Sequence, residues 1–148
     1  MSHSEIEAFD STLQTTNTWL NDIAKGLGVQ DRHSAYHALR VVLHALRDRL
    51  SVDQAAALGS QLPMLVRGIF FEGWQPQGKP LRIRHRDEFL QPIAKQLTQG
   101  GYDPEMVTRT VFDVLSRHVS KGEARHLKWA MPSEIRSFFP DEYHTLWF

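Results

Sequence analysis

Apolar residues recur along most of the chain at the three- and four-residue spacing of an amphipathic α-helix. Residues 35–50 carry the clearest stripe. A second fills residues 104–119, where Asp103 and Pro104 suit the N-cap and the first helical position. No segment alternates apolar and polar residues over the length of a strand, so we predict an all-α protein. The expected core positions are Ala35, Ala38, Leu39, Val42, Ala45, Leu46, Leu50, Val107, Val111, Val114, Leu115 and Val119.

The pattern repeats along the chain. Residues 38–70 align with residues 107–139, a shift of 69 positions. Two amphipathic helices can match by chance, but here serine and proline fall in register as well as the apolar positions, which favours a duplication. Nine of the 33 aligned pairs are identical: Arg40/Arg109, Val42/Val111, Leu46/Leu115, Ser51/Ser120, Ala55/Ala124, Leu58/Leu127, Pro63/Pro132, Arg67/Arg136 and Phe70/Phe139.

This repeat predicts a single domain over residues 1–148, a compact helical bundle built from two similar multi-helix units and an N-terminal helix. The units are residues 17–74 and 87–148, and the linker between them, residues 75–86, contains prolines and a glycine that disfavour regular structure. The linker also carries a run of basic residues, which we interpret as a solvated surface.

Short helices are predicted after each long one. Ser51 with Gln54, and Ser120 with Glu123, have the spacing of a capping box, in which two side chains satisfy the free N–H groups at a helix start. Proline then begins a further short helix in each unit, at a position where its missing N–H costs nothing. These prolines are Pro63 and Pro132.

The N-terminal extension has apolar residues at alternating spacings of three and four, which predicts one helix with a heptad seam. The weak helix formers Thr15, Thr16 and Thr18 leave open a break into two pieces. The seam positions are Ile6, Phe9, Leu13, Thr16, Leu20, Ile23 and Leu27.

The two units differ in the short helix after the proline. In the second unit this helix has one polar side. In the first unit the corresponding helix is apolar nearly all round and should be buried on more than one side. We consider two covers: the N-terminal extension with Ile6, Phe9 and Leu13, or a second molecule, either another copy or a foreign protein. The expected interaction surface is Met64, Leu65, Phe71 and Trp74.

Composition narrows the function classes. Lys+Arg and Asp+Glu are both 17, so a net charge of zero argues against a nucleic-acid partner held by a broad basic surface. There is no cysteine, which excludes disulfides and thiolate chemistry. No apolar stretch approaches the length of a membrane span and no leader is evident, so we expect a cytoplasmic protein that does not bind membranes.

Candidate chemistry is limited to a histidine-bearing helix face. His33, His37 and His44 share one side of the helix, and the first two could bind one metal ion if Asp31 or His3 supplied a further ligand. The alternative is a solvated polar face, which neighbouring arginines favour because they repel a cation. We find no nucleophile motif and no phosphate-binding glycine loop, and expect no catalytic residue and no cofactor.

Residues 38–50 (ALRVVLHALRDRL) and 61–74 (QLPMLVRGIFFEGW) resemble a bacterial family catalogued as domain of unknown function 2267, and residues 131–136 fit it too. The resemblance implies an all-helical duplicated domain and no assigned activity. We therefore expect a non-enzymatic interaction module, as a homo-oligomer or with another protein. The alternative is a helical bundle that binds a small molecule or metal through the histidine face.

Overall fold

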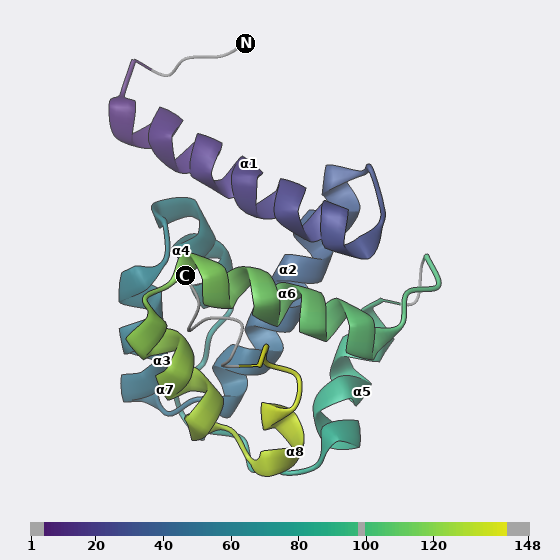
Figure 1. Cartoon of the computed structure of the whole chain (residues 1–148). Helices are drawn as coiled ribbons and strands as arrows, with labels where there is room; N and C mark the ends of the chain where they lie inside the picture. The colour runs from purple at the N-terminus through teal and green to yellow at the C-terminus, as the bar shows by residue number, and fades with distance from the viewer. Residues whose placement is uncertain (1–4, 98–99, 142–148) are drawn as a thin grey trace.

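The computed structural model describes residues 5–97 and 100–141, which contain eight α-helices and no strand (Figure 1). The predicted all-α fold is therefore confirmed. None of the described helices is both long enough and apolar enough to span a bilayer. The helices are α1 (Glu7–Leu27), α2 (Arg32–Arg49), α3 (Val52–Gln61), α4 (Met64–Phe71), α5 (Arg86–Gln96), α6 (Pro104–His118), α7 (Lys121–Ala130) and α8 (Ser133–Arg136).

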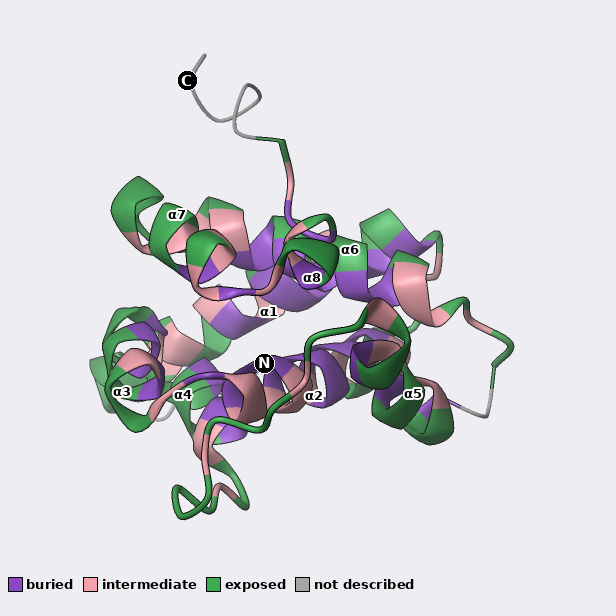
Figure 2. Ribbon diagram, turned by 90° about the horizontal axis from the view of Figure 1, so that it is seen from below, coloured by how far each residue is buried: buried purple, intermediate pink, exposed green. Residues whose placement is uncertain are grey.

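The helices form two layers whose buried faces meet (Figure 2). One layer holds α2, α3, α4 and α5, and the other holds α6, α7 and α8. Helix α1 packs along both α2 and α6 and also contacts α4. The core therefore lies around α2 and α6, which bury most of their apolar stripes there.

The predicted core positions of α2 and α6 are buried, with Ala45 only partly so. Helix α2 also buries Val41, Leu43 and the charged Arg47, which lie outside the predicted stripe. The reason is its central position, since α2 contacts α1, α4, α5 and α6. A single apolar stripe is typical of a helix packed on one side, and α2 is packed on several.

Helix α1 runs without interruption, so the break considered at its threonines does not occur. The hydroxyls of Thr15, Thr16 and Thr18 donate to the carbonyls four residues earlier, at 3.0, 2.7 and 3.2 Å. These bonds keep the threonine hydroxyls satisfied within the helix. Thr16 is also buried, so packing against the body supports the helix there.

The structure confirms the capping box at Ser51, whose hydroxyl accepts from Gln54 N while Gln54 Oε1 accepts from Ser51 N. The box predicted at Ser120 is only half formed. Ser120 Oγ accepts from Glu123 N at 3.0 Å, but Ser120 N donates to Oε1 of Gln61 at 2.8 Å. Gln61 ends α3, so this bond joins the two layers instead of closing the local box.

The segment between α4 and α5 follows the end of α2. Leu81 N donates to the carbonyl of Asp48 at 2.8 Å, and Arg49 Nε donates to the carbonyl of Ile83 at 2.7 Å. Part of the basic run is therefore held against the body rather than fully solvated, because its backbone carbonyls and amides bond to α2.

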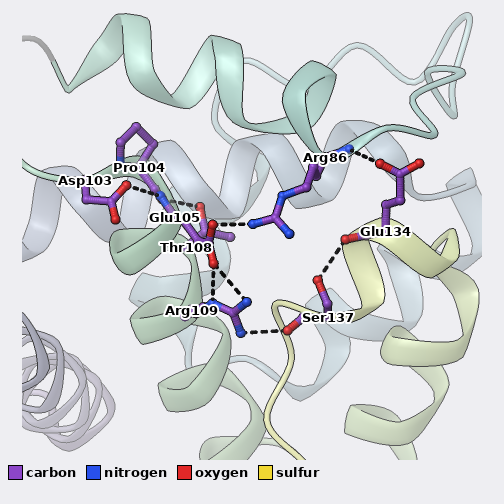
Figure 3. A network of polar contacts seen from close by, with 8 residues as sticks. All are labelled: Arg86, Asp103, Pro104, Glu105, Thr108, Arg109, Glu134 and Ser137. Carbon is purple, nitrogen blue, oxygen red and sulfur yellow. Dashed lines mark hydrogen bonds and ion pairs between the residues drawn. The ribbon is translucent and has the colours of Figure 1, made fainter.

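A polar network then ties α5, α6 and α8 together (Figure 3). Glu105 accepts from both Arg86 and Arg109, and Arg109 also donates to the carbonyl of Ser137 at 2.8 Å. Glu134 accepts from the backbone N–H of Arg86 at 3.3 Å. Both guanidinium groups lie within cation–π distance of the Phe138 ring.

Candidate functional site

Helix α4 buries one face and leaves its first turn open. Val66, Ile69 and Phe70 lie in the core, whereas Met64 is 50% exposed and Leu65 is 40% exposed. Within the single chain, α4 is therefore not covered on its second side at the first turn, and cover by a second molecule stays a prediction. Helix α1 meets this turn through the hydroxyl of Thr12.

Two of the four predicted surface residues belong to the edge of the core. Phe71 and Trp74 are partly buried, with ring centroids 5.3 Å apart. Phe71 lies against α3 at Gly59, where an added Cβ would come within 2.6 Å of the ring. The indole N–H of Trp74 is buried without a hydrogen-bond partner among the described residues.

The N-terminal end of α1, residues 5–13, which we call the α1 tip, does not cover α4 with its apolar stripe. Ile6, Phe9 and Leu13 are 49%, 51% and 44% exposed. The contact is made by Thr12, whose hydroxyl oxygen accepts from the backbone N–H of Leu65 at 2.9 Å. Of the two covers considered, the one by Ile6, Phe9 and Leu13 is therefore not made, since these side chains are exposed.

Together with Met64 and Leu65, these residues leave five large apolar side chains exposed on α1 and α4, two helices that contact each other (Figure 1). We call this group the α1–α4 patch, and it consists of Ile6, Phe9, Leu13, Met64 and Leu65. Exposed apolar side chains gathered on neighbouring elements are candidates for an interaction site.

Charge around the patch is asymmetric. The α1 tip carries Glu5, Glu7 and Asp10, and the first basic residue of α1 is Lys25. Helix α4 begins after Pro63 without a side-chain cap, so the positive end of its helix dipole lies at the patch. The patch thus has an acidic end on α1 and a partially positive end on α4.

The three predicted histidines do not converge on one point. His44 Nε2 lies 2.7 Å from the carbonyl of Ile69, and His37 Nε2 lies 2.7 Å from the carbonyl of Gln96. A carbonyl only accepts, so each of these nitrogens carries a proton and cannot bind a metal. Burial is the largest cause that lowers the pKa of His44. The positive charges of Arg47 and Arg40 lower this pKa further.

No group of three or more His, Cys, Asp or Glu side chains in the described part of the chain is arranged to hold a metal ion. Asp31, the suggested further ligand, instead caps α2. Its oxygens accept from His33 N at 2.9 Å and Ser34 Oγ at 3.0 Å, and these bonds lower the pKa of its carboxyl. His3, the other suggested ligand, lies outside the described residues.

His33 and His37 instead line a pocket between the end of α1, the starts of α2 and α6, and the end of α5 with the turn that follows it. We call it the α1–α2–α6 pocket. Its volume is about 630 Å³, within the range of roughly 300–1,000 Å³ typical of small-molecule sites. Buried apolar side chains and partly exposed polar ones both contribute to its wall: Leu27, Asp31, His33, Ser34, Tyr36, His37, Ala38, Gln96, Leu97, Gly100, Tyr102 and Val107.

Sequence reasoning missed Arg47, which is 5% exposed. Its guanidinium donates to the carbonyls of Phe70 and Glu72 at 3.0 and 2.8 Å and pairs with Asp48 at 2.9 Å, so it closes the end of α4. An arginine within a helical stripe of mixed polarity gave no signal that it would be buried. The burial of Arg47 is explained by the backbone carbonyls of Phe70 and Glu72, which lie at the end of α4, far away in the sequence.

The family model described as "Uncharacterized conserved protein (DUF2267)" matches residues 16–138. No curated protein matches the chain.

Proposed function

The chain belongs to the DUF2267 family of uncharacterised conserved proteins, and from this premise we propose that it is a non-enzymatic interaction module that pairs with a second copy of itself. The observation that carries the proposal is the α1–α4 patch, in which five large apolar side chains are exposed beside one inter-helix contact. The proposal needs no catalytic residue and no cofactor.

The heptad seam of α1 supports a helical partner. Its later positions Leu20, Ile23 and Leu27 pack into the body, while its first positions, Ile6, Phe9 and Leu13, continue the same spacing outside it. A stripe of this spacing is typically buried against another helix. A second α1 tip provides such a helix with the same stripe, as a two-fold interface requires.

Charge favours an antiparallel pairing of the two tips. Parallel tips would bring the carboxylates of Glu5, Glu7 and Asp10 together with those of the partner, which costs free energy by repulsion. An antiparallel pair places Phe9 against the partner's Leu13 instead. The acidic start of each α1 then lies over the start of the partner's α4, whose dipole favours negative charge.

The test is the native mass of the protein, measured by light scattering after size-exclusion chromatography. We expect a dimer for the unmodified chain and a monomer for Leu13→Glu and for Leu65→Glu, since each variant places a carboxylate in the apolar centre of the interface. The matched control is Leu81→Glu, because Leu81 is also 40% exposed but lies in the connector. It should keep the dimer mass.

Circular dichroism separates lost pairing from lost folding, because both substituted side chains are partly exposed in the single chain and the variants should stay helical. A monomeric unmodified chain would overturn self-association. A dimer that survives both Leu13→Glu and Leu65→Glu would show that pairing uses another surface.

We also propose that residues 17–74 and 87–148 derive from one duplicated unit. Helix boundaries that lie 69 residues apart support this duplication. Ser51 and Ser120 cap α3 and α7, and Pro63 and Pro132 precede α4 and α8. A chimera in which residues 120–123 take the sequence of residues 51–54 should fold with nearly unchanged thermal stability. Loss of cooperative unfolding in this chimera would contradict structural equivalence.

A further inference from the structure

We propose that the α1–α2–α6 pocket binds an organic cation with a flat apolar body, of the arylalkylamine class. This site is separate from the α1–α4 patch, since its residues come from the opposite end of α1 and the start of α2. It therefore goes beyond the proposed self-association, and either proposal can fail without the other.

The wall of the pocket suits an apolar body. Leu27, Ala38, Leu97 and Val107 are buried and give the pocket an apolar lining on the side of the core. A volume of about 630 Å³ exceeds what a single bound water requires and matches a small organic molecule. These four side chains are already largely removed from water, so a ligand would gain apolar burial chiefly against the partly exposed rings of Tyr36 and Tyr102.

Charge selects the polar end of the ligand. Asp31 is the one lining residue of the described chain with a permanent charge, and no lysine or arginine lines the pocket. The neighbouring Arg32 donates to Oδ1 of Asn21 at 3.1 Å. Asp31 accepts hydrogen bonds from His33 N, Ser34 Oγ and the backbone N–H of Ser34, and a carboxylate offers about four acceptor positions. Its remaining capacity can accept an N–H from an ammonium group.

Aromatic and neutral polar groups complete the recognition. Tyr36 and Tyr102 come from separate elements on the wall, and a tyrosine ring attracts a cation over its face. His37 Nε2 donates to the Gln96 carbonyl, which leaves Nδ1 as an acceptor for a ligand N–H. Acceptors and rings are the partners that a protonated amine uses, whereas a carboxylate ligand would need donors.

The experiment is a titration of the full chain with tryptamine and with indole-3-propionate, followed by calorimetry and by the NMR signals of the tyrosine rings. The two probes share an indole and differ in the sign of their charge. We expect saturable binding of tryptamine to one site and no binding of the acid. Absence of saturable tryptamine binding, or equal binding of both probes, would overturn the proposal.

Variants locate the site. Asp31→Asn keeps one N-cap acceptor and removes the charge, so it should weaken tryptamine binding about two- to fivefold. It should also lower the melting temperature slightly, because the fold stabilises the ionised carboxyl at this helix start, so affinity is compared well below the unfolding transition. Tyr36→Leu should weaken it by a similar factor because the ring is lost. Asp53→Asn, in the first turn of α3 away from the pocket, is the matched charge control and should change nothing. Equal affinity of Asp31→Asn and the unmodified chain would overturn the assignment.

Discussion

In the first half of the molecule α4 presents Met64 and Leu65 to solvent, and at the positions 69 residues later α8 presents Ser133 and Glu134. Glu134 accepts from the ring of His85 at 2.8 Å and from the backbone of Arg86, so this corner is tied to α5 by polar contacts. The first half has no equivalent polar tie at Leu65, apart from its backbone bond to Thr12.

The supporting framework is nevertheless similar in the two halves. Arg67 donates to the carbonyls of Gly59 and Leu62 at 2.8 and 2.9 Å, and Arg136 donates to the carbonyl of Met131 at 3.1 Å. Both arginines thus bond to carbonyls at the end of the preceding helix, where such groups lack helical partners. Two outward positions therefore decide whether this corner is an apolar surface or a polar junction.

The largest expected effect tests the shared core. Leu46→Ala and Leu115→Ala should each lower the free energy of unfolding by about 2–5 kcal/mol, because both side chains are fully buried. The shift of the urea midpoint measures this, with the exposed Leu81→Ala as control. If either substitution leaves the midpoint unchanged, the two leucines do not hold equivalent core positions.

The next substitution should lower the free energy of unfolding more in the first half than at the corresponding position of the second half. Gly59→Ala should cost about 1–3 kcal/mol, because the new methyl group meets the Phe71 ring. The position 69 residues later is Lys128, so Lys128→Ala should cost much less by the same urea measurement. Equal costs would show that Phe71 moves aside without strain.

Removal of the arginine contacts should have a smaller effect. Arg67→Met and Arg136→Met should each cost about 0.5–1.5 kcal/mol, since water can replace part of a partly exposed hydrogen bond. We expect the larger loss at Arg67, which bonds to two carbonyls. Thermal unfolding of the two variants checks the order, and a larger loss at Arg136 would contradict it.

The pH dependence of stability should also differ between the halves. Burial lowers the pKa of His44, so below about pH 6.5 the unfolded chain binds the proton more readily than the folded chain. The free energy of unfolding should therefore decrease as the pH falls from about 6.5 to the folded-state pKa. His44→Gln should reduce this decrease in urea unfolding measured across the range. An unchanged profile would show that His44 does not contribute.

His85 should behave in the opposite way. Its hydrogen bond to Glu134 raises its pKa, so its contribution is present below about pH 6.5 and is lost as the pH rises through the folded-state pKa. In Glu134→Gln the His85 pKa should fall toward its ordinary value, as followed by NMR titration of the ring. Ser133→Ala is the neighbouring control and should leave the titration as it was.

Much of the local structure could be predicted, because its causes are local. The apolar spacing located α2 and α6, Asp103 with Pro104 fixed the start of α6, and the Ser51 capping box formed as expected. The Ser120 box did not, because Gln61 of another layer bonds to Ser120 N. Competition from a distant side chain cannot be read from the spacing of two residues along the chain.

The candidate sites were predicted only in part. Met64 and Leu65 are exposed, but Phe71 and Trp74 join the edge of the core because Gly59 lets a ring approach α3. The histidine face was identified, yet its members separate: His44 bonds to α4, while His33 and His37 line a pocket with Tyr102. Helical spacing shows which residues share a face and not which distant element meets them.

The sequence by itself determined the helices, their caps and the side of each helix that is apolar, because backbone propensity and periodicity act over a few residues. Only the tertiary structure decided that α2 is enclosed by several helices, that Arg47 is buried against carbonyls of α4, and that Thr12 rather than the apolar stripe meets α4. These outcomes depend on contacts between residues far apart in the chain, where packing and hydrogen-bond satisfaction outweigh local preference.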